Sequence, residues 1–261
     1  MKASTKHHPT TSNGKPRRKS VTTNAVKKPD RSPRRRKTRV AADKPESGPR
    51  LGELAYRGIL EGLFDRRVPA GSFFSQSELA RLLNLPIQPL RDALRVLETE
   101  GILTIHARSG IEFLKADLEL ARSTYQYRSI IERAAARAYA ESADSAEIAA
   151  LINDHRALLE RVEREGATDA VNIDMEKLEQ RFHGSMIAAL QNPLIEVTAR
   201  RLKNYVSLIR LNRRSTTPRV IRTIREHLEV LEGCAARNPE AAEAALTYHF
   251  QAALQRILGM A

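Results

Sequence analysis

A glutamate and a histidine on one predicted helix have the types and spacing of metal ligands. Glu179 and His183 are four residues apart, so their side chains lie on the same face of a helix. Met175, Phe182 and Met186 make this face apolar, which turns both polar groups toward a core. A polar group that points inward needs a partner, and a metal ion is one such partner.

Two further histidines lie in apolar stripes of later predicted helices. His227 and His249 are flanked at helical spacing by, respectively, Val220, Ile224, Leu228 and Leu231, and Ala242, Ala245, Leu246 and Ala253. Three imidazoles and one carboxylate would suit a divalent metal ion, with Zn or Ni preferred and Fe or Cu also compatible. The alternative is that each ring is bonded separately inside the core, for example to a backbone carbonyl. His155 also lies on an apolar stripe, and we expect it to be a packed or interface residue without a ligand role.

Six predicted helices position these side chains. They cover residues 117–141, 144–165, 169–190, 193–213, 218–237 and 239–258. Asp144, followed three residues later by Glu147, marks the start of the second helix, while Gly166 and two Asn-Pro pairs mark boundaries. Because the connections are short and no strand pattern competes, the sequence predicts an all-α antiparallel bundle of six or seven helices over residues 116–261.

Residues 51–115 have the pattern of a winged helix-turn-helix. A helix over residues 51–64 is followed by a second that starts at Ser75, with Glu78 as the partner in a capping box. Asn84-Leu85 forms the turn, Pro86 suits the first turn of the third helix, and Gly101 ends that helix. The β-prone segments 102–105 and 111–114 predict a hairpin wing. The expected fold is therefore mostly α, a winged helix followed by a helical bundle.

The polar face of the third helix predicts contacts with DNA. In a helix-turn-helix the second helix of the pair enters the major groove, where Gln reads adenine and Arg reads guanine. The predicted contacts are Ser77, Gln88, Arg91, Arg95 and Arg108, the last at the tip of the wing. A protein-binding winged helix is the alternative, and it stays open because residues 51–115 hold eight basic and eight acidic side chains.

The positive charge of the chain belongs to its first 50 residues. They hold 16 Lys or Arg against three acidic side chains and so account for the whole net charge of +13, since the rest holds 28 of each sign. This tail contains the run Arg34–Lys37, has few large apolar residues and is predicted to be disordered. It either binds phosphate without reading sequence or is a solvated tail without a specific role. The lack of a long apolar run and of a secretory signal, together with the single Cys234, predicts a cytosolic, nucleoid-associated protein without a membrane segment.

The stretch from Pro69 to Gly101 contains the motifs Ala70-Gly71, Glu78-Leu79-Ala80, Pro89-Leu90-Arg91-Asp92-Ala93-Leu94 and Glu100-Gly101. With these motifs it resembles the N-terminal domain of the GntR superfamily of bacterial transcription regulators. The chain departs from the family at Pro86-Ile87-Gln88, where the family usually has Ser-Arg-Thr. The absent Arg is a usual DNA contact, so the resemblance implies an operator that differs from the typical one.

The C-terminal half resembles the FCD type of sensing domain found in FadR-like regulators. Metal-binding members carry Asp-x-x-x-His, then Asn-Pro, then Glu-His and a last His. Here the corresponding residues are Glu179 and His183, Asn192-Pro193, Glu226-His227, and His249. The resemblance covers residues 51 to about 258. It implies metal binding by Glu179 and the three histidines, with Glu where Asp is usual, and it implies that Arg128 faces a pocket for an effector.

These patterns together predict a ligand-responsive transcription regulator rather than an enzyme. By resemblance, a divalent metal and a small carboxylate effector bind the helical domain, and a homodimer acts as a repressor on a two-fold, double-stranded DNA operator. One competing hypothesis is a metal-dependent enzyme fused to a DNA-binding module, although no spare general base or nucleophile motif accompanies the metal ligands. The other is a nucleic-acid binder that acts through the tail without reading sequence.

Overall fold

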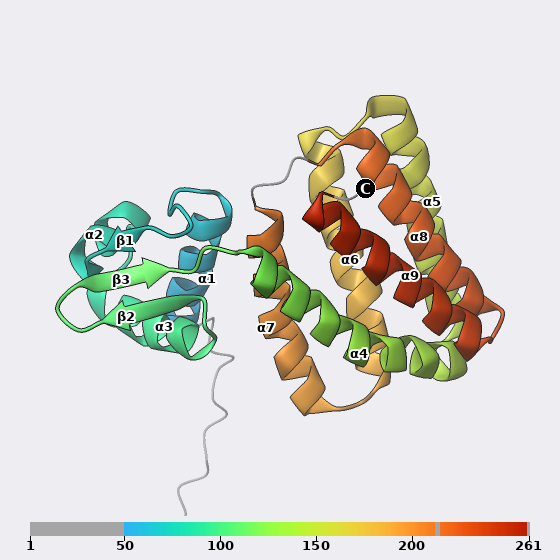
Figure 1. The fold of residues 1–261 in the computed structure, drawn as a ribbon, viewed down its shortest axis with the longest axis horizontal. Helices are drawn as coiled ribbons and strands as arrows, with labels where there is room; N and C mark the ends of the chain where they lie inside the picture. Colours follow the sequence, from blue (N-terminus) through green and yellow to red (C-terminus); the bar gives the residue numbers. More distant parts are fainter. Residues whose placement is uncertain (1–49, 212–214, 260–261) are drawn as a thin grey trace, which may run out of the picture. The chain divides into compact units, whose positions relative to one another are not determined.

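The computed structural model describes residues 50–211 and 215–259. Its N-terminal part contains α1 (Leu51–Phe64), β1 (Phe73–Phe74), α2 (Gln76–Leu83), α3 (Ile87–Thr99), β2 (Leu103–His106) and β3 (Gly110–Phe113). This is the predicted winged helix-turn-helix (Figure 1). The predicted disorder and the polycationic run of the tail fall on residues 1–49, which lie outside the described residues.

Local signals set the ends of α2 and α3. The Ser75 hydroxyl accepts a bond from the Glu78 amide, and the Glu78 carboxylate accepts one from the Ser75 amide, which completes the predicted capping box. Asn84 ends α2 with a φ of 52°, and Gly101 follows α3 with a φ of 75°. Pro86 lies just before α3 as its N-cap rather than inside the first turn. Its extended backbone of φ −64° and ψ 142° sets the turn before α3.

The wing contains one strand that the sequence pattern did not predict. β2 and β3 form the expected antiparallel hairpin, with Leu103 opposite Phe113. β1 adds to the other edge of β3, so that the strand order is β1-β3-β2. A two-residue strand is too short to show an alternating pattern, and only its pairing with β3 identifies it.

The C-terminal part consists of six described helices, as predicted. They are α4 (Leu118–Ser142), α5 (Ser145–Glu165), α6 (Asp169–Ala189), α7 (Pro193–Arg210), α8 (Thr217–Ala235) and α9 (Pro239–Leu258). Side chains of Asp117, Asp144, Thr168, Asn192 and Asn238 accept backbone N–H bonds at the starts of α4, α5, α6, α7 and α9. These caps satisfy donors that a helix end leaves unpaired.

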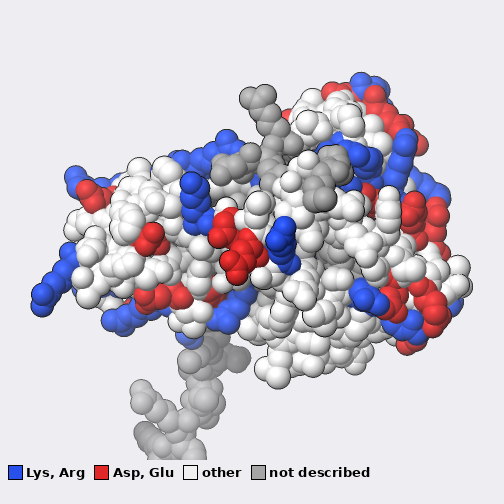
Figure 2. Space-filling view, viewed as in Figure 1, with Lys and Arg blue, Asp and Glu red and all other residues white. Residues whose placement is uncertain are grey.

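The bundle places α6, α8 and α9 around a common interior. α9 packs against both α4 and α8, α4 packs against α6, and α5 packs against α8 (Figure 1). The main core includes Tyr139, Phe182, Leu231 and Phe250. No helix among the described residues is long and apolar enough to cross a membrane. On the face drawn in Figure 2, basic and acidic side chains are interspersed, as expected for a part of the chain with balanced charge.

Candidate metal centre and nucleic-acid interface

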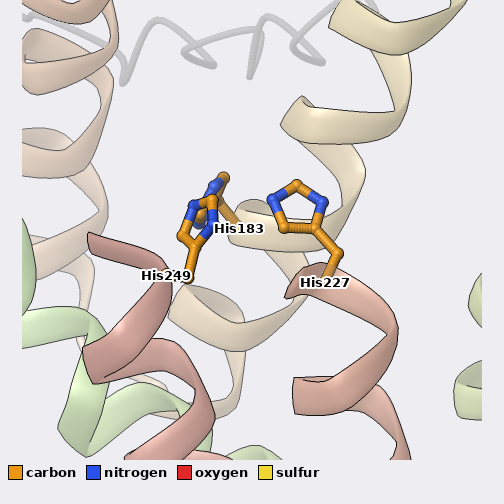
Figure 3. A group of neighbouring side chains, drawn as sticks. All are labelled: His183, His227 and His249. Atoms are coloured by element: carbon orange, nitrogen blue, oxygen red, sulfur yellow. The ribbon is translucent and has the colours of Figure 1, made fainter. Parts of the chain in front are cut away.

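Three histidines from three helices meet inside the bundle (Figure 3). His183 comes from α6, His227 from α8 and His249 from α9, and each offers a ring nitrogen within 4.8 Å of the other two. His227 and His249 are buried, and 12% of the His183 side chain is exposed. The structure therefore brings together the three histidines that the apolar stripes singled out.

The Nε2 atoms of these rings are the unsatisfied groups of the cluster. Each is buried and has no hydrogen-bond partner among the described residues. Leaving a buried polar atom without a partner costs about 1–3 kcal/mol. Three such atoms at one place suit a ligand that can satisfy all of them at once.

Two carboxylates determine which nitrogen of His183 and His249 is protonated. The Glu132 Oε2 atom lies 2.6 Å from His183 Nδ1, and the Glu226 Oε2 atom lies 2.8 Å from His249 Nδ1. A carboxylate only accepts, so Nδ1 is the donor in both rings, and in the neutral rings the Nε2 lone pair stays available. This is the tautomer that a metal bound at Nε2 requires.

His155 sets the tautomer of the third ring. Its Nδ1 lies 2.7 Å from the Leu151 carbonyl oxygen, which can only accept, so His155 carries its proton there. Its Nε2 is then an acceptor, 3.2 Å from His227 Nδ1, and His227 in turn presents an Nε2 lone pair. Burial lowers the pKa of His155 and keeps the ring neutral. The sequence marked His155 as packed without a ligand role, and its position explains why it is polar.

Arginines hold both orienting carboxylates. Arg128 donates to the two oxygens of Glu132 at 2.7 and 3.4 Å, and Arg256 donates to those of Glu226 at 2.5 and 2.8 Å. Burial alone raises the pKa of the Glu132 carboxyl, but the charge of Arg128 and the hydrogen bonds from His183 and Arg128 lower it to about 2. Burial also raises the pKa of Glu226, but the hydrogen bonds from Arg256 and His249 outweigh this effect, so the pKa is lowered. Both groups are therefore ionised acceptors near neutral pH.

Glu179, the predicted fourth ligand, borders the histidines but is paired with a cation. Its oxygens lie 3.9 Å from His183 Nε2 and 3.8 Å from His227 Nε2, while Arg210 donates to it at 2.7 Å. Burial by itself raises the pKa of Glu179, but the charge of Arg210 holds it well below its usual range. Burial also lowers the pKa of His183, and that of His227 well below its usual value. Neutral imidazoles beside an ionised carboxylate form a donor set that fits a divalent ion of the zinc or nickel type.

A cavity of about 880 Å³ opens beside the histidines. Its lining includes His183, His249, Glu179, Arg128 and Arg210. The volume is in the range of small-molecule binding sites. Arg128 does line this cavity, as its predicted effector role requires, but its guanidinium is bonded to a carboxylate that orients a metal-ligand candidate.

The predicted DNA-contacting residues are all exposed on the winged helix. Ser77, Gln88, Arg91, Arg95 and Arg108 are all exposed, whereas Leu90, Ala93, Leu94 and Leu97 form the buried face of α3. Arg108 lies at the wing tip with a φ of 71°. Sequence reasoning missed Gln76, whose Oε1 accepts a bond from Arg91 Nε at 2.7 Å. This bond leaves both terminal nitrogens of Arg91 available to a guanine edge.

Comparisons with known proteins agree on one class. Residues 123–252 match the FCD domain family. The HTH-type transcriptional regulator YdhC of Bacillus subtilis (strain 168) is 22% identical over 195 residues, or 75% of this chain and 85% of the relative. The Nta operon transcriptional regulator of Aminobacter aminovorans is 30% identical over 140 residues, 54% of this chain and 64% of that protein. The transcriptional repressor RspR of Escherichia coli (strain K12) is 24% identical over 204 residues, 77% of this chain and 86% of its own length.

Solved structures support the fold. E. coli McbR/YncC superposes with a TM-score of 0.67 at 15% identity and covers 81% of this chain and 99% of its own. A GntR-type transcriptional regulator from Rhodococcus sp. RHA1 superposes with a TM-score of 0.62 at 18% identity. The match covers 81% of this chain and 97% of that structure. The curated relatives are transcription regulators by name, which supports a regulator over a metal-dependent enzyme. The chain belongs to the GntR family of transcription regulators, in the FadR-like branch that carries an FCD domain.

Proposed function

We propose that this regulator is a metal-dependent, homodimeric repressor that responds to a small carboxylate effector. In this proposal residues 51–115 bind a double-stranded DNA operator, residues 116–261 bind the metal and the effector, and residues 1–50 add charge-driven affinity for phosphate. A two-fold operator follows from a homodimer, because each protomer then presents one recognition helix to one half-site. The exposed apolar side chains of Ile130 on α4 and Tyr248 on α9, 67% and 58% exposed, would be available to a dimer contact.

The observation that carries the proposal is the set of three buried, unpartnered Nε2 atoms with bonded Nδ1 atoms. His183, His227 and His249 would hold the metal, and Glu179 would be the fourth ligand. A bound divalent ion of this type supplies a Lewis acid that takes up a carboxylate oxygen of the effector. Zn or Ni fits the neutral imidazole donors best. The separate bonding of each histidine within the core accounts for the Nδ1 atoms but leaves the three Nε2 atoms without partners.

Metal binding by the purified full chain is the direct test. We expect calorimetric titration of chelator-treated protein with Zn²⁺ or Ni²⁺ to give one site per chain, and His227→Ala to lose it. His106→Ala is the matched control, because His106 also bonds a glutamate, at 2.7 Å to Glu112, but lies on the wing and 39% exposed. Equal binding by the wild type and His227→Ala would contradict the proposal.

Sequence reading by α3 is tested by selecting duplexes from a random library with the full chain. Arg91→Ala should abolish the selected preference, since one bidentate Arg–guanine pair contributes about 1–3 kcal/mol of discrimination. Ile87→Arg restores the residue type usual in the family and should strengthen binding, because Ile87 is 39% exposed on the same helix. If Ile87→Arg weakens binding, this face does not lie against DNA. Deleting residues 1–50 should lower affinity and keep the preference, whereas a tail-driven binder would lose nearly all affinity.

Helix α7 supports a link between the cavity and the winged helix. The Tyr205 hydroxyl donates to the Glu100 carbonyl oxygen at 2.6 Å, directly after α3, and Asn204 donates to the Tyr56 hydroxyl at 3.1 Å. The same helix carries Arg210, which pairs with Glu179. We therefore expect chelation of the metal, or addition of a cognate acid, to change affinity for the selected duplex. If neither changes it, the effector response is wrong while the DNA-binding function stands.

A further inference from the structure

The arginines around the histidine cluster have different surroundings. Arg128 and Arg256 are largely buried, and each engages both oxygens of a glutamate that orients a histidine. Arg210 instead pairs through one terminal nitrogen with Glu179, its Nε has no hydrogen-bond partner among the described residues, and its side chain is 33% exposed. Because Arg210 lines the cavity at the end of a flexible side chain, it is the cation of these three that can change partner at least cost.

The Glu179 carboxylate is the point where Arg210 and a metal ion would compete. One of its oxygens accepts from Arg210 and lies 3.9 Å from His183 Nε2, and the other lies 3.8 Å from His227 Nε2. The carboxylate therefore lies between the guanidinium and the histidine nitrogens. A metal ion on those nitrogens and the guanidinium of Arg210 would both need the negative charge of Glu179.

The balance of charge in the cluster indicates what must follow metal binding. Without metal, Arg128 balances Glu132, Arg256 balances Glu226 and Arg210 balances Glu179. An imidazole must be neutral to bind a metal, so the histidines add no charge to the loaded site. A divalent cation adds two positive charges to this buried group. Uncompensated charge in a protein interior is costly, so the loaded site requires negative charge from a ligand. An acid with one carboxylate supplies half of it, and an acid with two supplies all of it.

We propose that Arg210 is a second anion-binding group of the cavity, released from Glu179 when a divalent cation takes that carboxylate, and that the loaded pocket prefers acids with two carboxylates. One carboxylate of the acid binds the cation, and the other pairs with the freed guanidinium. A fork of N–H donors suits a carboxylate by two parallel bonds. The inference rests on the proposed metal site and adds to it the chemical class of the effector and the residue that selects it.

The test separates metal affinity from acid affinity in one variant. Arg210→Met keeps an unbranched, flexible stem but removes the guanidinium and its charge. Because the competitor for Glu179 is then absent, Zn²⁺ should bind the acid-free variant more tightly than the wild type, by about tenfold to a hundredfold, the range for one charge-assisted hydrogen bond. The zinc-loaded wild type should bind succinate more tightly than butyrate, an acid with the same number of carbons, and Arg210→Met should lose about tenfold or more of this preference.

Two further variants control the experiment. Arg200→Met removes another arginine of α7 that lines the cavity and is exposed, and it should change neither zinc affinity nor the preference for succinate. Arg210→Lys keeps the charge without the fork and should retain a weakened preference, which also covers the case in which Arg210→Met does not fold. Both affinities are measured calorimetrically on the full chain.

Three results would overturn the inference. If Arg210→Met weakens zinc binding, Arg210 positions Glu179 and does not compete with the metal. If the loaded wild type does not distinguish succinate from butyrate, or if Arg210→Met distinguishes them equally well, the second carboxylate has no partner at Arg210. If the wild type binds no zinc at all, the proposed function itself fails, and this result is distinct from the first two because it is seen in the unchanged chain before any acid is added.

Discussion

Replacing His155 tests whether the tautomer of His227 is set by a hydrogen bond. His155→Phe keeps a ring of similar shape beside Phe182 and His227, whose ring centroids lie 5.5 and 5.3 Å away. It removes the Nε2 acceptor that lies 3.2 Å from His227 Nδ1. His227 is fully buried, and the described residues offer its Nδ1 no other hydrogen-bond acceptor, so the proton is no longer held on Nδ1. The ring should present its Nε2 lone pair less often.

The expected loss can be expressed as stability. Removing a group that orients a metal-bound histidine typically weakens metal binding by about 10- to 100-fold. At a free zinc concentration of about 100 times the wild-type Kd, metal binding stabilises the wild type by ~2.7 kcal/mol, and a variant with about 30-fold weaker binding by ~0.9 kcal/mol. At about 2–4 °C per kcal/mol for a chain of this size, the zinc-induced rise in Tm should fall from about 5–11 °C to about 2–4 °C.

Thermal unfolding with and without zinc measures this difference within each variant. The comparison cancels the separate cost of about 1–3 kcal/mol that an unpaired His227 N–H imposes on the metal-free protein. His155→Gln supplies an amide oxygen as acceptor and should recover part of the zinc-induced rise. His106→Phe, on the wing, should behave like the wild type. A zinc-induced rise in His155→Phe equal to that of the wild type would refute the assignment of the His227 tautomer.

Other properties follow from the same contacts. Burial lowers the pKa of His183 from 6.5, and that of His227 further, so the unfolded chain binds protons that the folded chain does not. The metal-free protein should therefore lose stability as the pH falls below about 6.5, by up to about 1.4 kcal/mol per pH unit for each ring. Denaturant titrations at pH 7, 6 and 5 check this, and equal stability at all three would contradict it. Gly101→Ala should destabilise the protein by about 1–3 kcal/mol, because a side chain is strained at this positive φ. The added Cβ would also lie 2.5 Å from the Tyr205 hydroxyl oxygen. Gly52→Ala, which meets no atom within 4 Å on helix α1, should be neutral or stabilising, and similar losses in both variants would argue against the close approach at Gly101. Chelation of metal-loaded wild type should lower its Tm, whereas His227→Ala should not respond.

Most elements of the fold could be predicted from the sequence because their signals are local. The Ser75–Glu78 capping box, Gly101 and the Asn caps before Pro193 and Pro239 act on residues within one helical turn. Apolar periodicity likewise identifies the buried face of each helix. β1 escaped prediction because a two-residue strand has no period, and it exists only through its pairing with β3.

The candidate site was predictable as a set of residues but not as a set of contacts. Apolar stripes around His183, His227 and His249 showed that polar groups point inward, and a family resemblance suggested a shared ligand. The same pattern placed His155 on a stripe and could not distinguish an orienting ring from a packed one. Gln76 gave no signal, because its bond to Arg91 joins positions 15 residues apart on two helices.

The sequence by itself determined the helices, the inward faces and the residue types that could bind a metal or DNA, because these depend on neighbours along the chain. Only the tertiary structure decided which nitrogen each histidine presents to the cluster. It also decided that Arg210 pairs with Glu179, and that Arg128 donates to Glu132 while it lines the cavity. The physical reason is that these bonds depend on how α4 to α9 are rotated and packed against one another. Helical periodicity tells which face is buried, but it does not tell which side chain of another helix that face meets.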